Sequence, residues 1–340
     1  MKKTSWFILL ALAGVAAAAW QRFHAPDAAQ TVVVYVSHDE VFSEPILKDF
    51  EKETGIKVRA VYDTEETKSA GAMNRLIAEK NNPQADVYWA NEPIRAEVLR
   101  QQHIAAPYLS PNAAAIPAAF RNPEGYWTGF AARARVLVVH EGVTPAPNSI
   151  TSYMDPQWNG KTVIANPLFG TTTTQIAALF ALWGDESARA FMQTMRDNGV
   201  KLSPSNGDSA DLVARDQFVF SLVDSDDVVN RMKQGEPVTM VYPDQGEGEI
   251  GCLIVPNATV LIAGAPHPDA GRKLIDYLLT AETEKKLAFS DAAQIPLHPN
   301  VATPAGLRSL ETIKAMKVDY AAVAIKLQAI QLFLKNWAGS

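Results

Sequence analysis

Cysteine is nearly absent from this chain of 340 residues, in which Cys252 is the only one. A single thiol forms no intrachain disulfide, and it cannot supply the several thiolates of a structural zinc site. The chain therefore has to fold on its apolar core. Seven tryptophans, thirteen phenylalanines and a hydrophobic fraction of 47% provide that core, and the length predicts two domains.

Runs of basic residues and the common catalytic motifs are missing as well. The formal net charge is −6, and no lysine or arginine run marks a basic face, which argues against a nucleic-acid partner. The sequence has no Gly-x-Ser-x-Gly elbow, no His-Glu-x-x-His zinc helix and no Walker-type glycine loop. We therefore expect a protein that is not an enzyme. A hydrolase that uses paired carboxylates is the enzymatic alternative.

The N-terminus has the pattern of an export signal. Lys2 and Lys3 form a basic start, residues 6–19 are apolar and uncharged, and the last of these are small alanines suited to cleavage. We expect residues 1–29 to be a signal peptide and leader, and the mature protein to be periplasmic. An uncleaved anchor is the alternative, although the apolar run is shorter than the ~20 residues of a membrane-spanning helix.

Apolar patterning predicts an α/β fold. Residues 31–36 form a β-branched run typical of a buried strand, and the amphipathic helix that follows is expected to end at Thr54 and Gly55. Residues 56–61 give the next strand, and strands and helices continue to alternate along the chain. This order indicates open sheets with helices packed on their faces.

Three later segments complete the coarse prediction. An apolar strand at 133–140 is expected to carry the chain from one lobe to the other. Two separate helices are expected at 172–182 and 187–198.

Several segments carry a resemblance to a known family. Residues 50–58 read Phe-Glu-Lys-Glu-Thr-Gly-Ile-Lys-Val, and residues 83–92 read Pro-Gln-Ala-Asp-Val-Tyr-Trp-Ala-Asn-Glu. With residues 132–136, 166–175 and 265–268, they make the chain resemble the ferric-ion-binding proteins and their relatives, the bilobed periplasmic receptors of ABC importers. The resemblance covers roughly residues 31–300, and it is more specific for the fold than for the ligand.

The resemblance implies a two-lobed periplasmic-binding-protein fold of the class II type. Each lobe is then an open, mostly parallel sheet flanked by helices, with the ligand cleft between the lobes. The expected parts are an N-terminal lobe that begins with residues 31–132, a C-terminal lobe at 133–256, a return to the N-terminal lobe at 257–310, and C-terminal helices packing on the lobes at 311–340. The implied partners are an ABC permease and its ATPase, and the protein is expected to be a monomer.

The family's site lies in the cleft, and its positions transfer only in part. Glu92 falls where ferric-binding relatives place a carboxylate ligand, whereas the family's histidine position falls on Asp39, with His38 one residue earlier. The paired tyrosines that bind iron as phenolates in the family are replaced at residues 224–227 by Asp-Ser-Asp-Asp. The usual phenolate chemistry is therefore missing.

The acidic residues at this position have a physical interpretation of their own. Asp224, Asp226 and Asp227 follow a predicted apolar strand at 218–223, and open α/β sheets present their ligand crevice at the carboxyl ends of strands. Carboxylates this close repel one another unless a cation lies among them. The cluster therefore predicts a site for a hard cation or for a ligand ammonium group.

Two interpretations of this cluster stay open. In the first, Asp39 and Glu92 complete a site whose oxygen ligands suit Ca²⁺, Mg²⁺, Mn²⁺ or iron, and His38 would favour a transition metal. In the second, Asp224 or Ser225 caps a solvated helix start, and the following acids favour the helix dipole.

A second candidate site is the glycine at position 170, which is followed by four threonines and a predicted helix. Free N–H groups at a helix start bind anions together with threonine hydroxyls, and in this family the equivalent loop often holds an anion. The candidate anion ligands are Thr171, Thr172, Thr173, Asn206 and Arg133. Simple N-capping by Thr171 or Thr172, and an ordinary ion pair for Arg133, are the alternatives.

Ser37, Ser225 and Tyr242 are further candidates for the cleft, although Tyr242 precedes an ordinary Pro-Asp turn. The prediction as a whole is a solute-binding protein that captures a metal ion, iron first, with an accompanying anion by closure of its lobes. No cofactor is required beyond such a bound metal and its synergistic anion. A receptor for a phosphorylated or phosphonate organic molecule is the alternative ligand class, and a ligand-sensing ectodomain is the alternative role.

Overall fold

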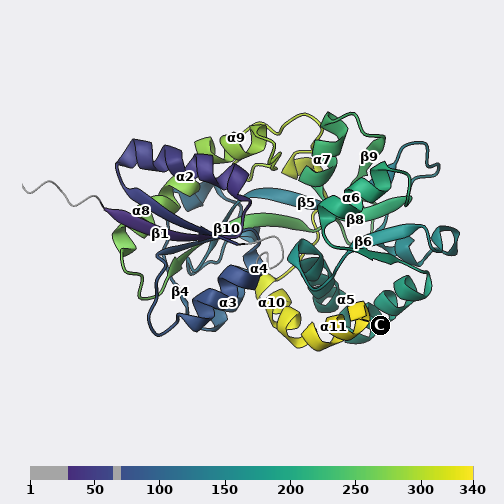
Figure 1. The fold of residues 1–340 in the computed structure, drawn as a ribbon, viewed down its shortest axis with the longest axis horizontal. Helices are drawn as coiled ribbons and strands as arrows, with labels where there is room; N and C mark the ends of the chain where they lie inside the picture. Colours follow the sequence, from purple (N-terminus) through teal and green to yellow (C-terminus); the bar gives the residue numbers. More distant parts are fainter. Residues whose placement is uncertain (1–29, 64–69, 340) are drawn as a thin grey trace, which may run out of the picture.

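The computed structural model describes residues 30–63 and 70–339. The predicted signal peptide and leader at 1–29 lie outside the described residues. Within them, two α/β lobes lie side by side, joined by long strands (Figure 1), so the predicted fold class is confirmed. None of the helices in this part of the chain combines the length and the apolar character that crossing a membrane requires.

The N-terminal lobe is built on a mixed sheet. Its parallel strands are β1 (Thr31–Val36), β2 (Lys57–Tyr62) and β3 (Val87–Ala90), and the antiparallel β10 (Ile254–Ile262) also pairs with the short β4 (Ala105–Ala106). The helices are α2 (Glu40–Thr54), α3 (Ala70–Ala78), α4 (Pro93–Gln101), α8 (Pro268–Leu278) and α9 (Ala281–Phe289). Helix α2 ends where the sequence predicts, because Gly55 adopts the left-handed φ of 73° as its C-cap.

The C-terminal lobe has a second mixed sheet. Its strands are β5 (Thr128–His140), β6 (Thr162–Ala165), β7 (Lys201–Ser203), β8 (Phe220–Asp224) and β9 (Val238–Val241). Strands β6, β7 and β8 are parallel, whereas β5 is antiparallel to β8 and β9. The helices are α5 (Gly170–Asp197), α6 (Asn206–Ala214) and α7 (Ser225–Lys233).

For this lobe one sequence prediction is confirmed and another needs correction. The two helices expected at 172–182 and 187–198 are present as the two parts of α5, which are separated by a break at Gly184, whose φ is 81°. The strand expected at 133–140 begins earlier, at Thr128, because its first half pairs with β10 of the N-terminal lobe.

Strand β5 belongs to both lobes. Up to Ala134 it pairs with β10, and from Arg135 onward it pairs with β8, where Arg135 lies opposite Asp224. The strand order β2-β1-β3-β10-β5-β8-β6-β7 is therefore continuous from one lobe to the other. The crossing places the side chains around residue 134 beside the space between the lobes.

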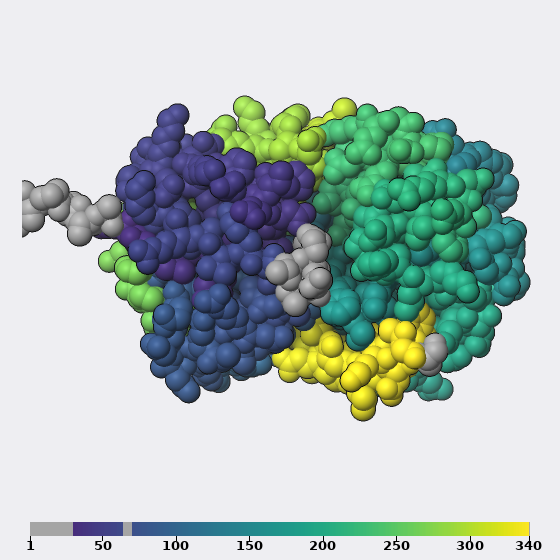
Figure 2. Space-filling view, viewed as in Figure 1, coloured from purple at the N-terminus to yellow at the C-terminus, as the bar shows by residue number. Residues whose placement is uncertain are grey.

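The C-terminal helices α10 (Tyr320–Ala329) and α11 (Gln331–Gly339) lie along one side of the molecule, below the lobes in Figure 2. Helix α10 packs against α4 of the N-terminal lobe and against α5 of the C-terminal lobe. The Tyr320 hydroxyl donates to the Ile254 carbonyl at 2.9 Å, and its ring meets Trp127 edge to face at 5.7 Å. The last helices therefore touch both halves of the fold.

Short 3₁₀ helices line the connections: Pro111–Ala115, Ala118–Phe120, Ile150–Met154, Pro156–Trp158 and Leu310–Thr312. Large apolar side chains fill the space between helices and sheets, and Trp89, Tyr153, Phe180 and Phe220 are almost fully buried. Each such side chain stabilises the fold by roughly 1.5–3 kcal/mol relative to exposure. The side chains of the cores are fully packed, so the residues that can form a site are those in the loops at the strand ends.

Candidate functional site

A cavity of about 310 Å³ lies between the lobes. Asp39 and Asn91 line it from the N-terminal lobe, and Arg133 lines it from the crossing strand β5. The remaining lining residues come from the C-terminal lobe: Ala165, Asn166, Phe169, Gly170, Thr171, Thr172, Pro204, Ser205, Asn206, Gly207, Asp224, Asp226, Asp227 and Arg231.

The topology explains why so many polar residues meet here. Strands β6, β7 and β8 are parallel, and each leads directly toward a helix: α5, α6 or α7. The carboxyl ends of parallel strands share one edge of the sheet. The N-termini of the three helices therefore converge on the cavity, each contributing residues from its first turn.

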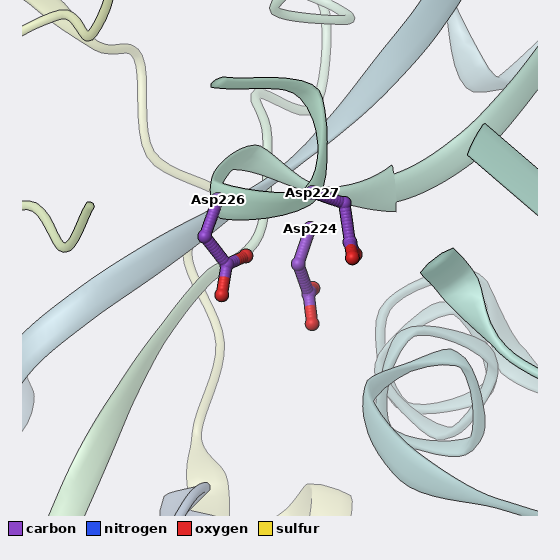
Figure 3. A group of neighbouring side chains, drawn as sticks. All are labelled: Asp224, Asp226 and Asp227. Atoms are coloured by element: carbon purple, nitrogen blue, oxygen red, sulfur yellow. The ribbon is translucent and has the colours of Figure 1, made fainter. Parts of the chain in front are cut away.

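The acidic cluster predicted from the sequence forms as a spatial cluster. Carboxylate oxygens of Asp224, Asp226 and Asp227, one from each residue, lie within 4.8 Å of one another. Figure 3 shows the three side chains projecting to the same side from the end of β8 and the first turn of α7. The arrangement places acceptor oxygens where they can bind one cation together.

Asp224 is the most heavily bonded member of the cluster. It accepts from Nη1 of Arg135 at 2.9 Å and from the Thr171 hydroxyl at 2.8 Å, and Nη1 of Arg133 lies 3.6 Å away. Burial opposes ionisation of Asp224, but the charges of Arg135 and Arg133 outweigh it and hold the pKa of this carboxyl below its usual value. Asp224 occupies the N-cap position of α7, as the capping alternative expects, but its side chain makes no capping hydrogen bond to the helix.

Asp226 and Asp227 are half-buried and carry opposite pKa shifts to Asp224. Burial raises the pKa of Asp226 to about 7, and the charges of Asp224 and Asp39 add to the effect against the attraction of Arg133. Burial also raises the pKa of Asp227 well above its usual value, with repulsion from Asp226 and Asp224. A cation between these carboxylates would relieve both the repulsion and the cost of burial.

Arg133 connects the two sides of the cavity. Its Nη2 donates to the backbone carbonyl of Asn91 in the N-terminal lobe, and its Nη1 faces Asp224 in the C-terminal lobe. Burial disfavours its charge, but Asp224 and Asp226 outweigh this and raise the pKa of Arg133. The guanidinium is therefore a permanent cation on the cavity wall.

The predicted anion loop forms at the start of α5. The Asn206 amide donates to the Thr171 hydroxyl at 2.9 Å, and the Thr172 hydroxyl donates to the Asn206 carbonyl oxygen at 3.2 Å. Arg135 donates to both threonine hydroxyls, at 3.0 and 3.1 Å. Since Asn206 and Arg135 occupy both hydroxyls, the groups of this loop that remain available to an anion are the first N–H groups of α5, which have no acceptor within the helix.

Some predicted residues do not line the cavity. Glu92 is fully buried, and its carboxylate accepts from Arg95 at 3.0 Å and from the hydroxyl of Thr174. The His38 ring is buried and stacks on Trp89 at 5.6 Å. Both side chains are packed into the protein beside the cavity, and so they are not on its wall.

The other predicted cleft residues that do not line the cavity have structural partners or positions of their own. The Ser37 hydroxyl donates to Asp63 at 2.6 Å, and the Ser225 hydroxyl accepts from the Ala134 N–H at 3.1 Å. Thr173 is fully buried on α5. Tyr242 lies on a separate groove beside β9, where its hydroxyl accepts from the Arg308 N–H at 3.1 Å.

Several lining residues were missed at the sequence level. Asn91 and Asn166 each follow a strand directly, so the rule that ligands bind at carboxyl ends of strands identifies them in retrospect. Arg231 lies one helical turn after Asp227 and is held by Asp211, with Nη2 and Oδ1 2.8 Å apart. No local motif marks Arg231, because its position depends on how α6 and α7 pack.

Comparison with known proteins is consistent with this geometry. Residues 46–315 match the model of a family described as bacterial extracellular solute-binding proteins. Iron uptake protein A1 from Synechocystis is 25% identical over 311 residues, covering 82% of this chain and 80% of that protein. A putative 2-aminoethylphosphonate-binding periplasmic protein from Salmonella typhimurium is 26% identical over 324 residues, covering 90% of this chain and 92% of that protein.

Among solved structures, iron-bound HitA from Pseudomonas aeruginosa has a TM-score of 0.79 at 19% identity, covering 90% of this chain and 99% of HitA. This likeness shows a common fold. The resemblance read from the sequence is thereby confirmed, and the chain belongs to the bacterial extracellular solute-binding proteins.

Proposed function

We propose that this protein is the periplasmic solute-binding component of an ABC importer and that it captures a metal cation, iron first, with an accompanying anion. It acts as a monomer, delivers its cargo to a permease and its ATPase, and catalyses no reaction. Family membership and the relatives named for iron uptake support this role. The N-terminal lobe comprises residues 31–132 and 257–310, the C-terminal lobe comprises residues 133–256, and residues 311–340 form the C-terminal helices. The lobes close about the crossing of β5 and β10.

The charge of the cavity wall is the observation that supports a cation as the cargo. Among the described residues that line it, four carboxylates oppose the guanidinium groups of Arg133 and Arg231. Arg231 lies 2.8 Å from Asp211, which is outside the wall, and 3.9 Å from Asp227 on it. Burial and repulsion raise the pKa values of Asp226 and Asp227, and a cation that binds between them replaces their protons and is attracted strongly in this partly buried space. We assign direct contact with the cation to Asp226, Asp227 and Asp39, since Asp224 is bonded to Arg135 and Thr171.

The same cavity also has groups on its wall that favour binding of the accompanying anion. The first turn of α5 and the guanidinium of Arg133 lie on its wall beside the carboxylates. A helix N-terminus and a fixed arginine favour negative charge. Cation and anion therefore bind side by side and neutralise one another between the lobes.

A thermal-shift screen of the chelator-stripped protein tests this function. The ligands are Fe³⁺ supplied as a weak chelate, Mn²⁺, Ca²⁺, phosphate and 2-aminoethylphosphonate, each alone and in metal and anion pairs. Binding at 100 times Kd adds about 2.7 kcal/mol to the free energy of unfolding, so a large shift with iron plus an anion is the expected result. A shift with 2-aminoethylphosphonate in the absence of metal would instead identify an organic zwitterion as the cargo.

A further inference from the structure

We infer that the lobes close about a β-bulge at Ala131 of β5, and that the buried side chains of Asn257 and Glu284 stabilise the closed form against the backbone strain of that bulge. This hinge rests on the proposed function only through lobe closure, and it is independent of which solute the protein carries. Its effect is on the balance between the open and closed forms of the empty protein.

The hydrogen-bond ladder between β5 and β10 is interrupted at one level. Phe130 pairs with Asn257 and Ala132 pairs with Pro256, so Ala131 is the extra residue of a bulge. Pro256 has no N–H group and cannot donate to the ladder. Bulges bend a strand and disrupt its pairing locally. Since β5 passes into the other lobe shortly afterwards, the lobes can rotate here with few ladder bonds broken.

Ala131 has a strained backbone conformation at this level. Its φ is 39°, in the left-handed region, where a residue with a β-carbon is disfavoured and glycine is not. Such strain persists only where the surrounding contacts hold it in place. An open form in which Ala131 returns to an extended conformation releases the strain, and so Ala131 itself favours opening.

Two buried side chains hold the backbone of Ala131 in this conformation. Its N–H donates to Oε1 of Glu284 at 2.7 Å, and its carbonyl accepts from Nδ2 of Asn257 at 2.6 Å. Both side chains are fully buried. The indole N–H of Trp89 donates to Oδ1 of Asn257 at 3.2 Å and sets the orientation of the amide. Because a buried group that loses its partner is costly, these contacts favour the arrangement that contains the bulge.

A neighbouring buried amide has a donor that is not used in this arrangement. Oε1 of Gln294 accepts from Nδ2 of Asn257 at 2.6 Å, whereas Nε2 of Gln294 has no hydrogen-bond partner among residues 30–63 and 70–339. Gln294 is fully buried, and buried polar groups are nearly always satisfied. A donor that is free in one arrangement is available to a carbonyl of the bulge in another, as a hinge with two stable positions requires.

The arrangement with the bulge is the closed one, because the lobes touch in it. The buried carboxylate of Glu92 in the N-terminal lobe accepts from the hydroxyl of Thr174 in the C-terminal lobe. Lys233 of α7 pairs with Asp291, which follows α9 of the other lobe, at 3.4 Å. The bonds to Ala131 therefore support closure, and its strain opposes closure.

Two variants test the two sides of this balance by double electron–electron resonance of the chelator-stripped protein. Spin labels are attached to Lys52→Cys on α2 and Arg215→Cys after α6, two exposed positions on different lobes, while the buried Cys252 stays unlabelled. Ala131→Gly removes the strain and should shift the populations about tenfold toward the shorter, closed distance. Asn257→Ala removes a supporting bond and should shift them toward the longer, open distance.

Ala134→Gly is the matched control. Ala134 is fully buried on the same strand and pairs in register with Ile254, so glycine there relieves no strain and should not raise the closed population. Isothermal titration with iron in the presence of citrate gives a second readout. The Kd should fall about tenfold in Ala131→Gly, because apparent affinity follows the fraction of the binding-competent form.

An unchanged or longer distance in Ala131→Gly would overturn the hinge, and so would an equal shift in Ala134→Gly. Since Ala131→Gly removes only a strained methyl group, it decides the matter even if circular dichroism shows that Asn257→Ala does not fold. A shift of a folded Asn257→Ala toward the closed distance would also contradict the hinge. The expected distances in a wild-type background that binds no iron would contradict the proposed metal function and leave the hinge intact.

Discussion

The contrast between Asp224 and its neighbours governs the chemistry of this site. Asp224 is ionised and held by Arg135 and Arg133, whereas burial and mutual repulsion raise the pKa values of Asp226 and Asp227. Neighbouring carboxylates whose pKa values shift in opposite directions have different roles in a site. Asp224 is held in place by its partners, and in the proposed function Asp226 and Asp227 bind the cargo.

The raised pKa of Asp226 predicts a pH dependence of the empty protein. A folded pKa of about 7 against an unfolded value of 3.8 means that the folded state holds the extra proton between these values. The free energy of unfolding should therefore fall as pH rises from about 4 to 7, by more than ~1 kcal/mol. Urea unfolding at several pH values measures this.

The Asp226→Asn variant is the matched test of that slope, because asparagine removes the titration with little change in shape. Its free energy of unfolding should vary less between pH 5 and 8 than that of wild type. Glu186→Gln, at an exposed position on α5, is the control. An unchanged slope in Asp226→Asn would show that another group titrates.

The buried pair of Arg135 and Asp224 predicts a large loss on disruption. Arg135 is fully buried and donates to Asp224, Thr171, Thr172 and the Leu222 carbonyl. Breaking one partner of a buried pair costs about 3–5 kcal/mol, so Arg135→Gln should lower the free energy of unfolding by that amount in chemical denaturation.

A double variant separates the pair from the remaining contacts. Arg135→Gln combined with Asp224→Asn removes both charges of the pair, so its loss should be smaller than the sum of the two single losses. Additive losses would mean that the two side chains act independently.

Among the elements, the alternation of strands and helices was predictable because each element satisfies a local rule. The end of α2 follows from Gly55, and the parallel strands follow from their β-branched runs. The position of β10 between β3 and β5 was not predictable, because pairing between residues far apart in sequence leaves no local pattern. The same reason explains why the acidic cluster was foreseen and Arg231 was not.

The break within α5 depends on the backbone conformation of Gly184. Gly184 has φ 81° and ψ 166°, a conformation that is essentially restricted to glycine. A β-carbon there would meet no atom within 4 Å, so the penalty is purely conformational. Gly184→Ala should lower the free energy of unfolding by about 1–3 kcal/mol, and an unchanged thermal midpoint would contradict the backbone geometry.

For the whole molecule, the C-terminal helices join the two lobes on the side away from β9. Tyr320 contacts Trp127 and the Ile254 carbonyl, and Lys326 pairs with Asp185 of α5 at 2.6 Å. Tyr320→Ala should therefore cost about 3 kcal/mol, as removal of large buried side chains does. Calorimetry should show the lobes unfolding with less cooperativity, whereas a fully cooperative transition would mean that α10 does not couple them.

The proposed function requires that the carboxylates between the lobes bind a metal. Isothermal titration of the chelator-stripped protein with iron, in the presence of citrate, should give one site per chain in the wild type and at least a hundredfold weaker binding in the Asp226→Asn and Asp227→Asn double variant. Equal affinity in the two proteins would contradict the assignment of the site, and the absence of metal binding by the folded wild type would contradict the proposed function itself.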